Sequence, residues 1–249
     1  MRTCAALVLL LFGQNCLGQA YPEPEAAAAW RALAATYVRQ AVKDQALDRD
    51  PALSARVDTV MTAVGAAVAA VDPRFAGATW RAILIEDFGH GAAAFPGQII
   101  LMDAKFVRWL QLGDDELALI LAHEAAHVLA GHALEKLSFM AQVVGREKVP
   151  TASMALHEFL AQDSYAVAFQ PKARLHEREA DRLGAAIFFA AGYDAQRALA
   201  LFDKLARLES GGERRNPESH DPAEARKQAI AQVIAELERL HAGRGPGER

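Results

Sequence analysis

The chain has 249 residues, and its 27 basic and 31 acidic side chains give a formal net charge of −4. A chain of this length can bury a substantial hydrophobic core in one or two domains. Its acidic balance, without a block of lysines or arginines, argues against nucleic acid as the main partner.

The first twenty residues have the pattern of a secretory signal peptide. Arg2 precedes an apolar run over residues 5–12, and small residues lead to an expected cleavage site after Ala20. A lipoprotein anchored at Cys16 would need a small residue directly before the cysteine, and Asn15 does not meet this requirement. The sequence therefore predicts an exported protein, periplasmic or secreted.

Removal of residues 1–20 would also remove both cysteines, Cys4 and Cys16. Arg2 is the single charged residue in this segment, so 26 basic and 31 acidic side chains would remain, without any thiol. That composition excludes disulfide scaffolds, cysteine nucleophiles and zinc sites with cysteine ligands.

Composition and spacing predict a predominantly α-helical chain of the α+β class with a small β-sheet. The chain contains 54 alanines, and alanine is the strongest helix former. Apolar spacing predicts an amphipathic helix over residues 25–47, and residues 52–71 are expected to form a second helix. The apolar part of the second helix, residues 59–71, would be about 20 Å long, whereas a bilayer core is roughly 30 Å thick. We therefore expect a buried helix and no membrane span.

Two short β-branched runs, 79–86 and 98–102, predict strands. The glycine- and proline-rich segment between them, 87–97, favours a turn or an irregular edge. Acidic residues 114–116 then predict the start of a long helix that ends near Met140.

The second half of the chain continues this helical pattern. Residues 141–172 have a mixed pattern that indicates short helices and loop. Three further helices are expected at 173–190, 195–208 and 222–240, with a loop at 209–219. We expect one domain over residues 21–242, with its core at about 55–240 and a flexible tail at 243–249.

The most informative segment is His123-Glu124-Ala125-Ala126-His127. Helical residues four apart emerge from one face, so both imidazoles can reach one Zn²⁺ ion at about 2.0–2.1 Å. Glu124 is rotated by about 100° and can reach a metal-bound water without binding the ion. The alternative is a surface helix that happens to contain two histidines. It fits the apolar flanks poorly, because buried histidines are costly unless something pairs with them.

A catalytic zinc site needs a third protein ligand and an open position for water. His132 lies nine residues after His123, about 180° round a continuous helix, and is expected to face away. Glu177 and Asp181 share one helix face, so Glu177 could bind the ion while Asp181 accepts a hydrogen bond from a ligand histidine. Two alternatives stay open, namely His176 as the ligand and a merely solvated charged face.

These residues carry a family resemblance. The pattern His123-Glu124-x-x-His127, followed by Glu177-x-x-x-Asp181 and the phrase DRLGAAIFFAAGYDA, resembles the HtpX-like and CAAX-prenyl-protease-like zinc metalloendopeptidases, which are gluzincins. The resemblance covers roughly residues 55–240 and is strongest to the secreted or periplasmic soluble branch. It implies a zincin-like fold, one Zn²⁺ per chain, Glu177 as the third ligand and Asp181 behind a ligand histidine.

The same family has a strand and loop of the type Asn-Ala-Phe-Ala-x-Pro-Gly-Gly along the active site, and residues 91–98 are similar to it. Gly91 replaces the usual Asn, Ala93 the usual Phe and Gln98 the second Gly. Backbone groups of an edge strand would still bind an extended peptide. The side-chain contacts of the Asn are lost, so the resemblance does not carry over a substrate preference.

A third segment contains His220 and Arg226. Asp221, Pro222 and Glu224 have the pattern of a helix N-terminus with an aspartate cap, which explains them without any catalytic role. His220 and Arg226 match a histidine and an arginine that lie near the metal in the family. The resemblance implies that His220 stabilises an oxyanion or closes the open zinc position at rest, and that Arg226 supports it.

The predicted function is hydrolysis of peptide bonds in unfolded or envelope proteins, with Glu124 as general base for a zinc-activated water. The main alternative is a latent, chaperone-like quality-control protein whose site is held shut by the loop that carries His220. A purely structural zinc protein would need no general base, and another zinc hydrolase such as an amidase stays open. The expected partners are polypeptides, and peripheral association with a membrane is compatible with the sequence.

Overall fold

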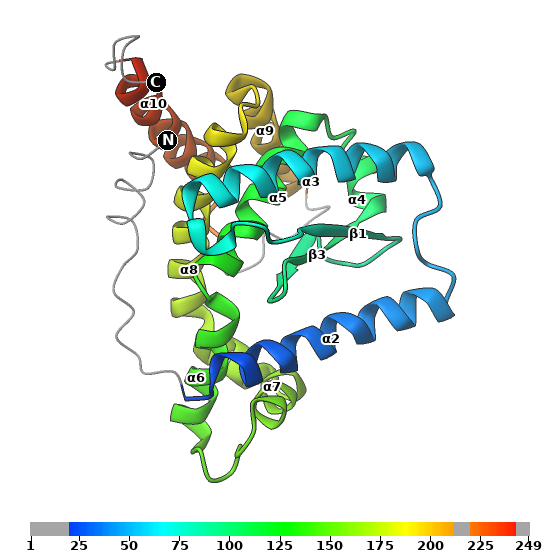
Figure 1. Cartoon of the computed structure of the whole chain (residues 1–249), viewed down its shortest axis with the longest axis vertical. Coiled ribbons are helices and arrows are strands. Elements are labelled where there is room, and N and C mark those ends of the chain that lie inside the picture. Colours follow the sequence, from blue (N-terminus) through cyan, green and yellow to red (C-terminus); the bar gives the residue numbers. More distant parts are fainter. Residues whose placement is uncertain (1–19, 212–219, 243–249) are drawn as a thin grey trace.

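A computed structural model describes residues 20–211 and 220–242 of the chain (Figure 1). The predicted signal peptide, apart from residue 20, and the predicted tail lie outside the described residues. Most of the loop expected at 209–219 lies outside them as well.

Helices dominate the fold, and a small sheet lies among them, so the predicted α+β class is confirmed (Figure 1). The helices are α2 (Glu23–Lys43), α3 (Pro51–Val71), α4 (Ala104–Trp109), α5 (Asp114–Leu129), α6 (His132–Val144), α7 (Ala152–Ala161), α8 (Asp163–Ala191), α9 (Ala195–Gly211) and α10 (Ala223–Ala242). A 3-10 turn, η1, covers Pro73–Phe75, and the strands are β1 (Arg81–Ile85), β2 (Ala92–Phe95) and β3 (Ile99–Asp103).

The sheet has the strand order β1-β3-β2, in which β3 is parallel to β1 and antiparallel to β2. Strand β2 therefore forms one edge, with Ala93 opposite Leu101 and Phe95 opposite Ile99. The segment expected as a turn or irregular edge thus contains a regular strand. Its alanine-rich sequence hides this, because alanine has a low strand propensity.

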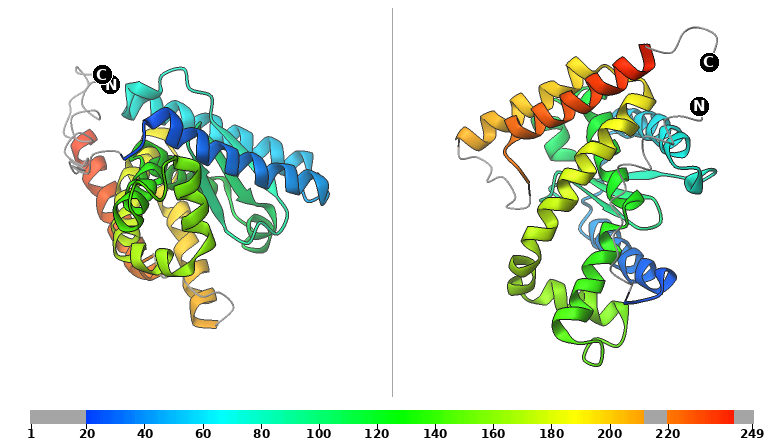
Figure 2. Two further views of the ribbon diagram at one scale, coloured as in Figure 1. Left: turned by 90° about the horizontal axis from the view of Figure 1, so that it is seen from below. Right: turned by 90° about the vertical axis from the view of Figure 1, so that its left-hand side faces the viewer.

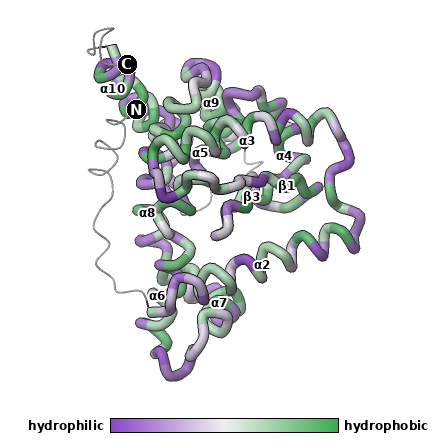
Figure 3. Tube along the Cα trace, in the orientation of Figure 1, coloured by the Kyte–Doolittle hydropathy of each residue, from purple (hydrophilic) through white to green (hydrophobic). Residues whose placement is uncertain are grey.

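The hydrophobic core lies where α3, α5 and α8 pack together. Helix α3 is capped by Asp50, whose carboxylate accepts from the backbone N–H of Ala52 at 2.9 Å. Hydrophobic residues follow α3 along most of its length (Figure 3), and Val57, Val64 and Val68 are buried. By length and composition α3 could cross a membrane, and α5 with α6 passes the same test as a bent pair. Here α3 is packed against α5 and α8, as expected for a core helix.

The prediction of one helix from residue 114 to about 140 is wrong, because the chain bends between α5 and α6. Gly131 has a left-handed φ of 72°, and the two helices differ in direction by 46°. Glycine adopts this conformation readily because it has no Cβ. Helical angles counted from His123 therefore do not apply beyond Gly131.

Helix α8 begins ten residues earlier than expected, at Asp163, whereas residues 141–162 contain the end of α6, a turn and the short helix α7, as predicted (Figure 2). The second half of α8 crosses α5, and α10 packs against it. At the crossing, a methyl group on Gly184 would lie 2.8 Å from the His123 Cα. This close approach brings the face of α8 that carries Glu177 and Asp181 against the histidines of α5.

Candidate metal centre

Helices α5 and α8 bring His123, His127 and Glu177 together in a cleft of about 1100 Å³. The two Nε2 atoms of the histidines are 3.1 Å apart. Glu177 Oε2 lies 3.3 Å from the Nε2 of His123 and 3.6 Å from that of His127. Ligand atoms at 2.0–2.1 Å around a tetrahedral Zn²⁺ would be about 3.3 Å from one another. The three atoms therefore have the spacing that such an ion requires.

The donor chemistry of the group also fits a cation. His123 Nδ1 lies 2.9 Å from Asp181 Oδ1, so a proton on Nδ1 leaves the Nε2 atom with a free lone pair. Glu177 Oε2 is a buried acceptor without an aligned hydrogen bond in the described part of the chain. Two imidazole lone pairs and a carboxylate oxygen that face one another are satisfied together by a metal ion.

The carboxylates make this group favour positive charge. Burial lowers the pKa of His123, but Asp181 and Glu177 outweigh it and raise the pKa to about 10. Burial raises the pKa of Glu177, and the facing histidines His123, His127 and His220 bring it far below its usual range. A metal ion competes with a proton for the same ligand atoms, so a site that holds a proton this strongly also attracts a cation.

Glu124 lies beside the metal group without belonging to it. Burial raises the pKa of its carboxyl group above the usual value, and His123 and the backbone N–H of Ala94 offset this only in part. Ala94 belongs to the edge strand β2, so the carboxyl group faces both the metal group and that strand. This position suits proton transfer to a substrate that lies along β2.

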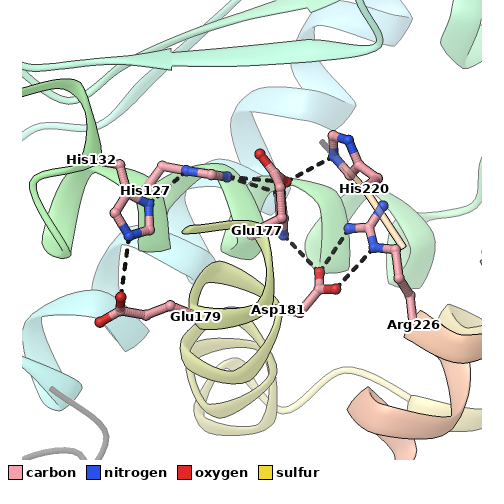
Figure 4. Close-up of polar contacts among 8 residues, drawn as sticks. His127, His132, Glu177, Glu179, Asp181, His220 and Arg226 are labelled. Atoms are coloured by element: carbon pink, nitrogen blue, oxygen red, sulfur yellow. Dashed lines mark hydrogen bonds and ion pairs between the residues drawn. The ribbon is translucent and has the colours of Figure 1, made fainter. Parts of the chain in front are cut away.

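The structure places His220 at the metal group and gives Arg226 a partner that the sequence does not predict (Figure 4). His220 Nε2 lies 2.8 Å from Glu177 Oε2. Arg226 donates to both carboxylate oxygens of Asp181, from Nε at 2.9 Å and from Nη2 at 2.7 Å. Arg226 therefore fixes the position of the Asp181 carboxylate, which in turn contacts the ligand His123.

An ion pair joins the segment that carries His220 to helix α8. Arg178 Nε donates to Asp221 Oδ2 at 2.7 Å, and Arg178 Nη2 donates to Oδ1 at 3.0 Å. Helix α10 begins at Ala223, one residue after the expected first helical residue Pro222. The segment is thus connected to the same helix that supplies Glu177.

His132 lies against the metal group, so the expectation that it faces away is wrong. The bend at Gly131 puts His132 Nδ1 2.8 Å from His127 Nδ1, and His132 Nε2 lies 3.4 Å from Glu179 Oε2 (Figure 4). A proton on His127 Nδ1 can be donated to His132, which leaves His127 Nε2 for a metal. Burial lowers the pKa of His132 to about 4, which keeps this acceptor neutral. Gly131 is the signal in the sequence that could have revealed this contact.

His176, the alternative ligand, turns away from the metal group. Its Nε2 lies 3.0 Å from Glu135 Oε2, and its ring stacks on that of His132 at 4.1 Å between centroids. Lys172 Nζ pairs with the same carboxylate at 2.6 Å. Burial raises the pKa of Glu135, but His176 and Lys172 together lower it to about 2. Among the described residues Glu177, and not His176, completes the metal group.

Comparison with known proteins agrees with this geometry. The model of peptidase family M48 matches residues 51–234, which include the helices that carry all three candidate ligands. The chain belongs to peptidase family M48. A curated relative, the mitochondrial metalloendopeptidase OMA1 of Schizosaccharomyces pombe, is 29% identical over 134 residues. The match covers 52% of this chain and 39% of OMA1. The match thus spans well under half of OMA1, and the predicted resemblance is confirmed at the level of the family.

Proposed function

We propose that this M48 peptidase binds one Zn²⁺ through His123, His127 and Glu177 and hydrolyses internal peptide bonds of unfolded envelope proteins. The observation that carries the proposal is the spacing of the three ligand atoms, 3.1, 3.3 and 3.6 Å, beside the separate carboxyl group of Glu124. When bound, the metal would polarise a water molecule and lower its pKa towards 7.

The side chains around the metal group supply the proton transfers and the charge stabilisation. Glu124 accepts a proton from the attacking water and returns it to the leaving amine. His220 donates from Nε2 to the oxygen on which negative charge develops. Asp181, held by two hydrogen bonds from Arg226, keeps the His123 ring oriented.

Strand β2 is the element proposed to bind the substrate backbone. Its free edge can add an extended peptide through N–H and C=O groups. Ala92, Ala93 and Ala94 line the cleft with small side chains, which favours the backbone of an unfolded chain over a particular sequence. The envelope location rests on the pattern of residues 1–20, and a mature N-terminus at Tyr21 in the exported fraction would support it.

The test compares the wild type with Glu124→Gln for cleavage of unfolded casein and for zinc content. Glutamine keeps the size of the side chain but cannot accept the proton, so cleavage should fall by about 10²–10⁴-fold at unchanged zinc content. The control is Glu158→Gln on α7, where the side chain lies outside the metal group. Equal casein cleavage by the wild type and Glu124→Gln would exclude this mechanism.

One observation favours a second candidate function, a latent chaperone-like protein. His220 Nε2 contacts the ligand oxygen of Glu177 at 2.8 Å, so the side chain stands where it can block the open ligand position. The variant His220→Ala separates the two candidates. Casein cleavage should fall if His220 stabilises the oxyanion, and it should rise if His220 holds the site shut.

A further inference from the structure

Two cations that line the cleft, Arg31 and Lys136, have no ion pair in residues 20–211 and 220–242, and Lys136 is the one that aromatic rings surround. Lys136 lies on α6, one helical turn after His132, and lines the same cleft as the metal group. Its contacts there are with aromatic rings: Nζ stands 5.4 Å from the ring centroid of Trp30, 5.2 Å from that of Phe159 and 5.7 Å from that of Phe169. No hydrogen bond or ion pair joins Lys136 to another described residue.

These three rings form an aromatic cage, and the packing around them fixes its shape. Trp30 comes from α2, Phe159 from α7 and Phe169 from α8, so three helices meet around an ammonium group carried by a fourth. Trp30 Nε1–H donates to the Ala133 carbonyl at 2.9 Å, and Phe159 packs edge-on against Phe169 with centroids 6.0 Å apart. The cage is therefore a built feature of the cleft.

The ammonium group in this cage retains unused hydrogen-bond donors. Burial lowers the pKa of Lys136, which shows that its charge is incompletely solvated. Aromatic faces stabilise the charge, but they do not accept its three N–H donors as a carboxylate oxygen does. The acidic group whose charge reaches Lys136 is Glu177, which belongs to the metal group.

We propose that Lys136 and the aromatic cage form a substrate subsite that binds a carboxylate of the polypeptide. The carboxylate belongs either to an Asp or Glu side chain or to a free C-terminus. This inference rests on the proposed function, because it assigns the substrate preference of the same cleft.

The length of α8 gives the position of this carboxylate relative to the cleaved bond. Phe169 and Glu177 are eight residues apart on the helix, which is about 12 Å along its axis. An extended peptide advances about 3.3 Å per residue. A straight extended peptide covers this length in about four residues, so we expect the carboxylate within four residues of the cleaved bond.

The test uses peptides that differ by one Glu-to-Gln exchange, scanned over four positions on each side of the cleaved bond, all with amidated C-termini. A second set has neutral side chains and either a free or an amidated C-terminus. In the wild type, the Glu peptide of a pair should have a kcat/KM at least about tenfold higher than the Gln peptide when the exchanged residue lies three or four positions from the cleaved bond. In Lys136→Met that ratio should fall to about one. The readout is the ratio within each peptide pair, because the charge of Lys136 also reaches Glu177 and its loss can change the cleavage of every peptide. In Lys136→Glu the preference should change to Lys-bearing peptides.

Two further measurements separate this inference from the proposed function. Lys148→Met changes an exposed lysine in a turn and should keep the wild-type ratio. Binding of the same labelled peptide pairs to Glu124→Gln, followed by fluorescence anisotropy, tests the subsite without hydrolysis. Tighter binding of the carboxylate peptides supports the subsite, whether or not any peptide is cleaved. Absence of cleavage by the wild type would overturn the proposed function but not the subsite. Equal binding and equal cleavage within every pair would overturn the subsite and leave the peptidase function standing.

Discussion

Gly184→Ala tests whether the close crossing of α5 and α8 sets the metal group. The added Cβ would lie 2.8 Å from the Cα of His123 and 3.0 Å from its backbone nitrogen. Both are backbone atoms, so no change of rotamer relieves the contact, and the helices must move apart. Glu177 lies two turns earlier on α8, so a shift of this helix also moves its carboxylate away from His123 and His127.

The size of the shift follows from ordinary contact distances. Carbon atoms pack at about 3.5–4.0 Å, so α8 must retreat from α5 by about 0.7–1.2 Å. Such overpacking costs about 1–3 kcal/mol, of which about 1 kcal/mol is offset because alanine is a better helix former than glycine. Metal–ligand distances tolerate only about 0.2 Å. We therefore expect a small loss of stability, up to about 2 kcal/mol, and a loss of zinc affinity of at least about tenfold.

Thermal unfolding of the chelated protein and zinc competition against a fluorescent chelator measure the two effects separately. Gly65→Ala is the matched control, because Gly65 is also helical and its added Cβ would meet the Trp80 side chain at 3.0 Å. A side chain can move where a backbone cannot, so this variant should keep its zinc affinity. If Gly184→Ala binds zinc as tightly as the wild type and unfolds at the same temperature or higher, the crossing does not set the metal group.

Three further changes test the groups behind the ligands. Arg226→Lys should retain more zinc affinity than Arg226→Met, because lysine keeps a positive charge beside Asp181. Equal zinc affinity in the wild type and both variants would contradict a role of Arg226 in zinc binding. His132→Phe keeps a ring but removes the partner of His127 Nδ1, so zinc affinity should fall by about 10–100-fold in the competition assay. The pKa of Glu135 is lowered to about 2, so its contribution is present above about pH 4.5 and is lost towards pH 2. Urea unfolding of the metal-free protein, with a chelator present, should show the wild type more stable than Glu135→Gln by on the order of 3 kcal/mol at pH 6, and this difference should fall to near zero at pH 2. A difference that does not change with pH would exclude a contribution from the ionised Glu135.

The two histidine ligands could be predicted from the sequence because their signal is local, whereas periodicity leaves His176 open beside Glu177 and the family resemblance selects Glu177. His123 and His127 are four residues apart, as are Glu177 and Asp181, and helical periodicity alone places each pair on one face. The pairing of the two faces depends on Gly184, which helical periodicity treats only as a weak helix former. The contact between the His123–His127 face of α5 and the Glu177–Asp181 face of α8 therefore becomes visible only in the tertiary structure.

The contacts behind the ligands could not be predicted in the same way. Arg226 reaches Asp181 across 45 positions of the chain, and no spacing rule covers that distance. Counting helical turns through Gly131 predicts that His132 faces away from the metal group, but a glycine after a long helix is a common signal for its end. A single left-handed residue thus changes which residue stands behind His127.

Glu177 and His220 are held in place by contacts of different kinds. Glu177 is fixed by α8, which is packed against α5 at the closest contact between the two helices. His220 precedes α10 on a segment joined to α8 by Arg178 and Asp221, whose side chains are 56% and 30% exposed. Exposed ion pairs contribute about 0–1 kcal/mol, so this pair opposes a movement of His220 only weakly. The contact that His220 makes with Glu177 at 2.8 Å therefore contributes more to its position than this exposed pair does, whereas Glu177 itself is held by the crossing of α5 and α8.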